Sequence, residues 1–244
     1  MKPPFFYISE YDDAQKQIVL NEETSKHVVQ VLRMKVGEPL NLTDGKGSLL
    51  TCEITDNNKK HCTVSVIGSH LPPPTSRRIT IAISLLKNTN RFEWFLEKAT
   101  EIGVTEIIPL VCERTEKEKF RFERLNGICI SAMLQSQQTW LPVLQEPRKF
   151  EDLKIWKCAD GSNLIAHCID GSKQELSNYQ IDTSSQLVPE LVRDSLICIG
   201  PEGDFTPKEI ELALHNNFIP VLLGETRLRT ETAGIVAATL LSQI

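Results

Sequence analysis

The chain has 244 residues, of which 41% are hydrophobic, and a formal net charge of −5. This length allows one large domain or two modest ones, and the acidic balance argues against broad nucleic-acid binding but not against a local basic surface. Residues 1–7 contain two prolines and precede Glu10, Asp12 and Asp13, which is not the pattern of a signal peptide. The longest weakly polar run, 233–241, is too short to cross a bilayer, so we expect a soluble, cytoplasmic protein.

The seven cysteines are an odd number, are scattered, and form no C-x-x-C pair or Cys/His cluster with metal-ligand spacing. Most lie in apolar, strand-like runs, as Cys198 does between Ile197 and Ile199. We therefore expect mostly buried thiols in a reducing compartment, without disulfides and without a metal site.

The first part of the chain predicts a small β-rich unit. Turn sequences at 44–47 and 56–59 separate short apolar runs, and one amphipathic helix with Val28, Val31 and Leu32 on its apolar side interrupts them. The predicted strands lie at 5–8, 17–20, 39–42, 49–54 and 62–67.

Consecutive prolines at 72–74 predict a linker over 71–77, because they continue neither a helix nor a central strand. We therefore expect a β-barrel domain over 1–72 and a second domain over 78–244.

After the linker, predicted strands and helices alternate, which favours a mostly parallel sheet. A helix is expected to begin at Thr206, where an N-cap hydroxyl, Pro207 and Glu209 form a capping box. The last helix is rich in small residues, which permits close packing, and the polar stretch 178–188 is expected to be an exposed loop. Strands are predicted at 79–86, 107–111, 163–169, 196–199 and 220–223, and helices at 91–102, about 120–135 and 232–240.

Two glycine turns, at 200–206 and 223–233, follow the last two predicted strands. They would converge at the carboxyl edge of the sheet, where open α/β sheets bind ligands. Neither turn has a dinucleotide or triphosphate fingerprint. Their carboxylates would repel a phosphate but tolerate a cofactor with positive charge; these are Glu202, Asp204, Glu225 and Glu231.

A second charged segment runs from Arg114 through Lys117 and Lys119 to Arg121 and Arg124. It is a candidate basic surface, although such a run is more often a solvated helix face.

The second domain carries a series of short motifs in a fixed order: Lys87 with 91–93, 98–104, Pro109 with 113–114, 135–136 with Pro142, 199–203 and 228–233. Together these motifs resemble the RsmE family. Members of that family are SPOUT-class methyltransferases that use S-adenosylmethionine to methylate N3 of a uridine in 16S ribosomal RNA of the small subunit. Residues 33–37 and 44–47 resemble the PUA-like RNA-binding domain of the same family.

The resemblance implies an α/β SPOUT domain with a parallel sheet and a C-terminal trefoil knot, an exception to the rule that chains are not knotted. A PUA-like β-barrel precedes it, and the family forms homodimers with the cofactor at the subunit interface. The same resemblance implies that S-adenosylmethionine contacts, largely through main-chain groups, Ile199, Gly200, Pro201, Glu202, Gly203, Leu223, Gly224, Leu228, Arg229, Thr230 and Ala233.

The reaction requires alignment of the uracil nitrogen with the activated methyl group and loss of its proton. Arg229 is the candidate for stabilising negative charge on the uracil oxygens. Glu231 is its orienting partner or the base, although a capping role is equally plausible. RNA contacts are expected from Arg114, Lys87, Gln135, Ser136 and Arg227.

The chain departs from the family pattern at 134–138, at Asp204 and at 226–227. These differences leave open which cations hold the RNA, with Arg227, Gln138 or Lys87 as substitutes. Two alternatives therefore stand beside the leading hypothesis: a catalytically silent RNA-binding factor, and a SPOUT enzyme that acts on another RNA nucleotide. A nucleotide-dependent oxidoreductase ranks below both, because the phosphate fingerprint is missing.

Overall fold

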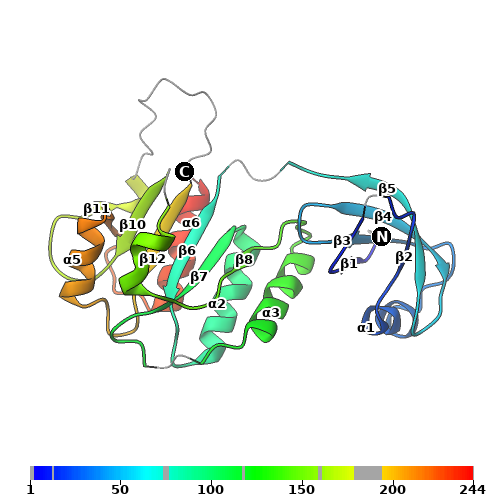
Figure 1. Cartoon of the computed structure of the whole chain (residues 1–244), viewed down its shortest axis with the longest axis horizontal. Coiled ribbons are helices and arrows are strands. Elements are labelled where there is room, and N and C mark those ends of the chain that lie inside the picture. Colours follow the sequence, from blue (N-terminus) through cyan, green and yellow to red (C-terminus); the bar gives the residue numbers. More distant parts are fainter. Residues whose placement is uncertain are drawn as a thin grey trace, which may run out of the picture. The chain divides into compact units, whose positions relative to one another are not determined.

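The computed structural model describes residues 3–12, 14–73, 77–116, 119–158, 161–178 and 194–243. The chain divides into two compact units, one formed by Met1–Pro74 with Met133–Leu141 and one by Thr75–Ala132 with Pro142–Ile244 (Figure 1). Part of the predicted linker, 74–76, and almost all of the predicted loop 178–188 lie outside the described residues.

The first unit contains a mixed sheet in which β1 runs parallel to β3 and the remaining pairs are antiparallel. Its buried face holds a core that includes Leu20, Leu40, Leu50 and Val64. Among the described residues β1 and β2 form the two edges of the sheet and do not pair with each other, so the β-barrel expected for this unit takes the form of a half-barrel. The strand order is β1 (Phe5–Tyr7), β3 (Pro39–Thr43), β4 (Leu49–Asp56), β5 (Thr63–His70), β2 (Gln17–Val19).

The predicted helix of the first unit is present as a short α1 (Glu22–Lys26) that continues into a π-helical turn, η1 (His27–Val31). Val28 is buried as expected, but Val31 is 67% exposed and Leu32 43% exposed, so their predicted place on the apolar side is wrong. The reason is the wider π turn, in which the Leu32 N–H donates to the His27 carbonyl five residues back and shifts the following side chains around the axis.

The segment Met133–Leu141 belongs to the first unit although it follows the linker in the sequence. The Gly47 N–H donates to the Thr139 carbonyl at 2.9 Å, and the Leu141 N–H donates to the Gly45 carbonyl at 2.8 Å. Gly47 has a φ of +103° and lies so close to the Trp140 ring that a Cβ would not fit. The position of the linker does not predict this grouping, because it depends on interactions distant in sequence.

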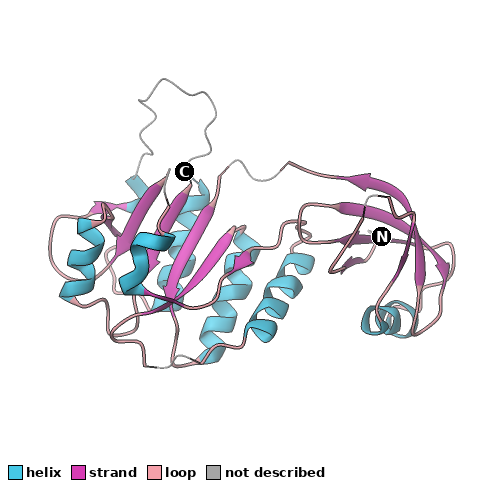
Figure 2. Cartoon of the chain, viewed as in Figure 1, coloured by secondary structure: helices cyan, strands magenta, loops and turns pink. Residues whose placement is uncertain are grey.

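The second unit is built on a parallel sheet, which confirms the predicted fold class (Figure 2). Every residue of β6 and β12 is buried, as expected for strands covered on both faces. The strand order is β11 (Gln174–Glu175), β13 (Ile219–Leu222), β10 (Ser162–Ala166), β12 (Ser195–Ile199), β6 (Ile79–Ser84), β7 (Glu106–Val111), β8 (Val143–Leu144), and β9 (Arg148–Lys149) also pairs with β7.

Helices cover both faces of this sheet. On one face α6 (Thr230–Gln243) packs against α2 (Thr89–Ile102), β6 and β12. A Cβ at Gly234 would lie 2.6 Å from the Phe95 ring, so the small residues of α6 do permit the close packing expected of them. The remaining helices are α3 (Phe122–Gln135), the short α4 (Leu153–Trp156) and α5 (Pro207–His215).

On the other face, Ile210 and Ala213 of α5 join Phe150 and Leu153 in a core with the inward side chains of the central strands. The capping box predicted for α5 is present, with Thr206 as N-cap and Pro207 at the start. It holds α5 directly after the first glycine turn, which fixes where that turn ends.

The cysteines are free, and all are buried except Cys158, which is half-buried, and Cys168, which is exposed. No group of acidic, histidine or cysteine side chains among the described residues has the arrangement of a metal site. Within the same residues, no helix combines the length and apolarity needed to span a membrane.

Candidate functional site

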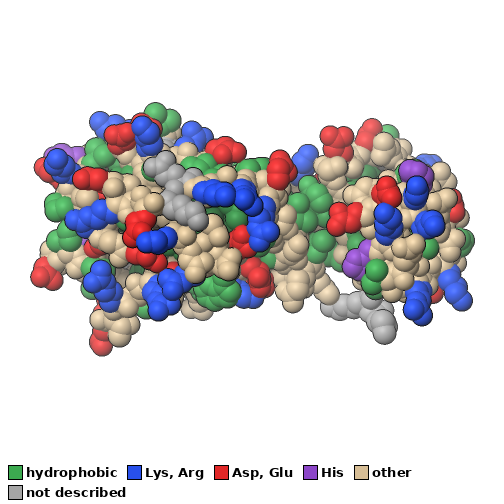
Figure 3. Space-filling model, turned by 90° about the horizontal axis from the view of Figure 1, so that it is seen from below, with side chains coloured by type: hydrophobic (Ala, Val, Ile, Leu, Met, Phe, Trp, Pro, Cys, Tyr) green, Lys and Arg blue, Asp and Glu red, His purple; other side chains and the backbone are tan. Residues whose placement is uncertain are grey.

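A cavity of about 640 Å³ lies at the carboxyl ends of β10, β12 and β13 in the second unit. The loops that follow these strands form most of its wall. The cavity therefore lies at the carboxyl edge of the sheet, where the two glycine turns predict a ligand site. On the face of the molecule that Figure 3 shows, both acidic and basic side chains are exposed. All residues expected to bind a cofactor line this cavity except Gly203: Ile199, Gly200, Pro201, Glu202, Leu223, Gly224, Leu228, Arg229, Thr230 and Ala233.

The two glycine turns are joined by a buried hydrogen bond. The Thr230 hydroxyl, at the start of α6, donates to the Gly200 carbonyl at 3.0 Å. Gly200 itself packs against Phe205, where a Cβ would come within 3.0 Å of the ring. The first turn is therefore held between the phenylalanine on one side and the second turn on the other.

The main chain of the second turn is available to a ligand. Among the described residues, no hydrogen bond joins the backbone groups of 224–228 to other parts of the protein. Gly224 has a φ of +137°, a conformation that side chains rarely adopt. Unpaired backbone groups in a cavity wall are normally satisfied by water or by a bound molecule.

Arg91 of α2 also lines the cavity and pairs with carboxylates from both turns. Its Nη1 lies 3.1 Å from Glu202 Oε1, and its Nε lies 3.6 Å from Glu231 Oε1. The sequence motifs include Arg91, but the prediction did not assign it to the site. The signal was its place on the first turn of the helix that follows β6, at the carboxyl edge of the sheet.

Glu231 is buried, with 6% of its surface exposed, and does not line the cavity. Its second oxygen, Oε2, has no hydrogen-bond partner among the described residues. Such an unpaired buried oxygen is uncommon in proteins. The contact with Arg91 gives Glu231 an immediate structural role, which is to orient that guanidinium toward the cavity.

Arg227 and Arg229 are exposed and line the cavity. Neither forms an ion pair with a carboxylate among the described residues, so both guanidinium groups are available to an anionic or carbonyl-bearing ligand.

Gly203 and Arg114 interact with each other instead of lining the cavity. Arg114 Nη1 donates to the Gly203 carbonyl at 2.6 Å, and its side chain covers the glycine. Arg114, expected to contact RNA, therefore supports the first turn.

Asp204 departs from the family pattern without disrupting the turn. Its φ of +64° lies in the left-handed region, which aspartate tolerates better than most residues because its side chain bonds locally. Its carboxylate accepts from the N–H groups of Cys168 and Phe205, both at 2.8 Å. These bonds tie the first turn to the loop after β10.

The other residues predicted to contact substrate do not line the cavity. Lys87 is exposed and its Nζ lies 2.6 Å from Glu116 Oε2, an interaction that raises the lysine pKa. Gln135 and Ser136 lie at the end of α3, in the segment that groups with the first unit.

The loop after β10 was missed by the prediction, although it follows a predicted strand at the same sheet edge. It contributes His167, Cys168, Asp170 and Lys173 to the cavity wall. Burial lowers the His167 pKa, and the nearby Lys173 charge lowers it further. Lys173 Nζ also donates to the His167 carbonyl at 2.9 Å, which fixes the loop.

Known proteins are similar to this chain in both sequence and structure. Residues 73–242 match the model of an RNA methyltransferase domain, and 20–67 match that of an RNA methyltransferase PUA domain. A Rickettsia conorii protein named ribosomal RNA small subunit methyltransferase E is 30% identical over 97% of this chain and 94% of its own length.

Two solved structures extend this similarity. A probable rRNA-methyltransferase from Porphyromonas gingivalis has a TM-score of 0.87 and 38% identity, and the match covers 98% of this chain and 97% of that one. A putative methyltransferase from Legionella pneumophila, solved with the bound cofactor SAM, has a TM-score of 0.83 and 28% identity, with coverage of 100% and 98%.

Proposed function

Because the chain belongs to the RNA methyltransferase family, we propose that it is an S-adenosylmethionine-dependent methyltransferase of small-subunit ribosomal RNA. The name of the Rickettsia relative and the SAM bound to the Legionella protein support this function. The observation that carries it is the cavity of about 640 Å³ between the two glycine turns. The RsmE motifs at 199–203 and 228–233 extend the proposal to N3 of a uridine in 16S RNA.

The residues of the cavity fit S-adenosylmethionine. The volume lies within the range of about 300–1,000 Å³ typical of small-molecule sites. Ile199, Leu223 and Leu228 provide apolar wall, and the unpaired backbone groups of 224–228 provide donors and acceptors for a purine and a ribose. Glu225 is exposed, lines the cavity and forms no ion pair among the described residues, so it offers negative charge, and no phosphate-binding motif is present. When bound, S-adenosylmethionine supplies a methyl group already activated by its sulfonium.

We assign Arg229 the role of binding the uracil oxygens. It is exposed, lines the cavity and has no carboxylate partner among the described residues. A guanidinium there stabilises negative charge that develops on the base as its N3 proton leaves. Arg227, on the same loop and equally unpaired, is placed to contact the neighbouring RNA backbone.

We assign Glu231 as a positioning residue rather than the base. It is buried behind the wall and interacts with Arg91, which in turn reaches Glu202. These two ion pairs orient the guanidinium of Arg91, on α2, toward the cavity. Glu231 thus supports the site through Arg91.

We further propose that the first unit is the RNA-binding PUA-like domain, which the match over 20–67 supports. We also infer a homodimer and a C-terminal trefoil knot, as in the SPOUT class. The small, apolar sequence of α6, with Ile235, Val236 and Leu240 only half-buried, supports a subunit contact on that helix. Light scattering in solution tests the dimer. Modification of ribosomal RNA would take place in the cytoplasm.

The proposed function is tested with small ribosomal subunits from a strain that lacks the activity. The purified protein and labelled S-adenosylmethionine should transfer one methyl group, which mass spectrometry of nuclease fragments should locate on N3 of a uridine. A methyl group on another nucleotide would correct the target. An absence of S-adenosylmethionine binding in calorimetry would favour the silent RNA-binding alternative.

A further inference from the structure

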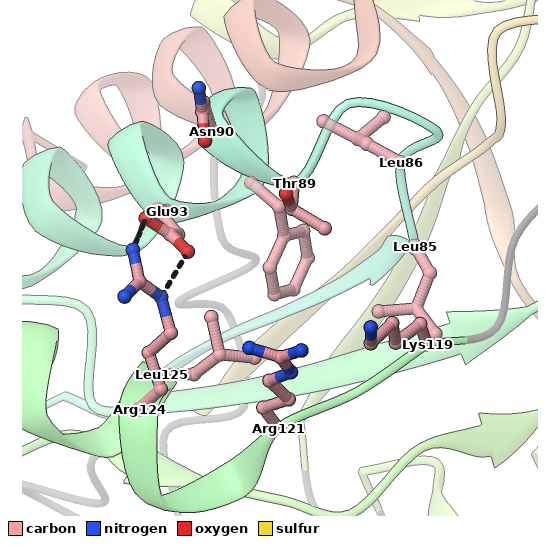
Figure 4. Close-up of a pocket in the computed structure, with 10 residues that line it drawn as sticks. Leu85, Leu86, Thr89, Asn90, Glu93, Lys119, Arg121, Arg124 and Leu125 are labelled. Carbon is pink, nitrogen blue, oxygen red and sulfur yellow. Dashed lines mark hydrogen bonds and ion pairs between the residues drawn. The ribbon is translucent and has the colours of Figure 1, made fainter.

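A second, smaller cavity of about 240 Å³ lies in the same unit, between the first turns of α2 and the start of α3 (Figure 4). Its floor is apolar, and polar and charged side chains line the rest of it. The lining residues are Leu85, Leu86, Thr89, Asn90, Phe92, Glu93, Lys119, Arg121, Arg124 and Leu125.

The cations at this cavity are not equivalent. Arg124 is bound by Glu93 through two hydrogen bonds of 2.7 and 2.9 Å, and this pairing lowers the pKa of the Glu93 carboxyl. Lys119 and Arg121 are exposed and form no ion pair with a carboxylate among the described residues. Figure 4 shows both side chains extending from the segment before α3 toward the same opening. The cavity therefore has two cations available to an anionic ligand.

The floor of the small cavity offers an apolar surface to a flat or compact group. Leu86, Phe92 and Leu125 are each at most 6% exposed and form its floor. Its volume is smaller than the range of about 300–1,000 Å³ that encloses drug-sized ligands, so it accommodates one ring system rather than a second cofactor. An apolar floor for one ring, with polar groups beside it and two cations at its rim, matches an unstacked nucleobase and its phosphates, the chemistry by which proteins read single-stranded RNA.

The two cavities lie on either side of the first turns of α2. Arg91 lines the large cavity, while Thr89, Asn90 and Glu93 of the same helix line the small one. Only these turns of one helix stand between residues that line the two cavities, so a nucleotide bound in the small cavity would lie close to one whose base enters the large cavity.

We propose that the small cavity binds the base of an unpaired nucleotide adjacent to the methylated one, and that Lys119 and Arg121 contact its flanking phosphates. This inference rests on the proposed function, because it requires an RNA substrate. It gives a role to the basic run at 114–124, part of which is otherwise an exposed charged surface.

The first test removes the two cations in a Lys119→Ala/Arg121→Ala double variant. With small ribosomal subunits from a strain lacking the activity, KM should rise at least about tenfold, as expected for lost bonds to charged groups, while kcat stays unchanged. The slope of log affinity against log salt should fall by about 1.4, the value for two phosphate contacts on a single strand. S-adenosylmethionine affinity, measured by calorimetry, should equal that of the wild type.

The matched control is Arg148→Ala/Lys208→Ala, which removes one arginine and one lysine that are exposed on the same unit and line neither cavity. If both double variants change KM equally, or if the Lys119/Arg121 variant loses kcat or cofactor affinity instead, the inference is wrong. If the wild type itself neither binds S-adenosylmethionine nor methylates the subunits, the proposed function fails and not this inference alone.

The second test locates the base. Subunits containing 4-thiouridine are irradiated with the protein, and the cross-linked peptides are identified by mass spectrometry. Cross-links from a nucleotide next to the target should map to 85–93 or 119–125. Cross-links that map elsewhere on the protein, with none in these two segments, would overturn the assignment.

Discussion

From the hydrogen bond between Thr230 and Gly200 we predict that the Thr230→Val variant is less stable than the wild type. The two residues are buried, and valine keeps the volume of threonine but cannot donate. The Gly200 carbonyl then loses its partner in an interior position, which costs about 1–3 kcal/mol. For a chain of this size, such a loss corresponds to a fall in melting temperature of roughly 2–4 °C per kcal/mol.

The same bond joins the two walls of the proposed cofactor cavity, so Thr230→Val should also weaken S-adenosylmethionine binding. Thr230→Ser is the matched control, because it keeps the hydroxyl and should retain most of the affinity. Thermal melts with and without the cofactor, together with calorimetry, measure both effects. Equal melting temperatures and equal cofactor affinities in the valine and serine variants would refute this account of the site.

Three further predictions concern separate parts of the second unit. Arg229→Ala should retain cofactor affinity and lower kcat for methyl transfer by about 100-fold or more, the loss typical for one charge-stabilising donor; an unchanged kcat removes this residue from the reaction. Gly234→Ala should place a Cβ 2.6 Å from Phe95 and destabilise by about 1–3 kcal/mol relative to Gly127→Ala, which has open space around it; equal melting temperatures would contradict the packing of α6. Burial lowers the pKa of His167 in the folded protein below its usual 6.5. As the pH falls, His167 therefore becomes protonated in the unfolded chain before it does in the folded protein. The free energy of unfolding is not reduced by this effect above pH 6.5 and decreases as the pH falls below it. His167→Asn should flatten that decline in melts between pH 7.5 and 5, and an unaltered pH profile would disprove it.

Features that depend on neighbouring residues in the sequence were predicted well. The capping box at Thr206, the alternation that gives a parallel sheet, and the two glycine turns at its carboxyl edge all arise from local chemistry. The cavity residues on these turns followed from the turns themselves, because the ends of parallel strands share one edge.

Features that depend on the rotation of a helix about its axis, or on contacts between residues distant in sequence, were not predicted. The π turn at His27–Val31 changes which side of the helix is buried, and no periodicity in so short a segment indicates it. Arg91 and His167 entered the site because of the rotation of α2 and the path of the loop after β10. The hydrogen bond from Arg114 to the Gly203 carbonyl is also not visible in the sequence, and the predicted contact of Arg114 with RNA stays a prediction.

The position of α2 between the two cavities has a thermodynamic consequence. Its first turns carry Arg91 on one side and Thr89, Asn90 and Glu93 on the other, so a shift of α2 on binding of one ligand would alter the wall that meets the second. The two binding free energies would then be coupled, and such coupling is reciprocal: the factor by which the cofactor changed RNA affinity would equal the factor by which RNA changed cofactor affinity.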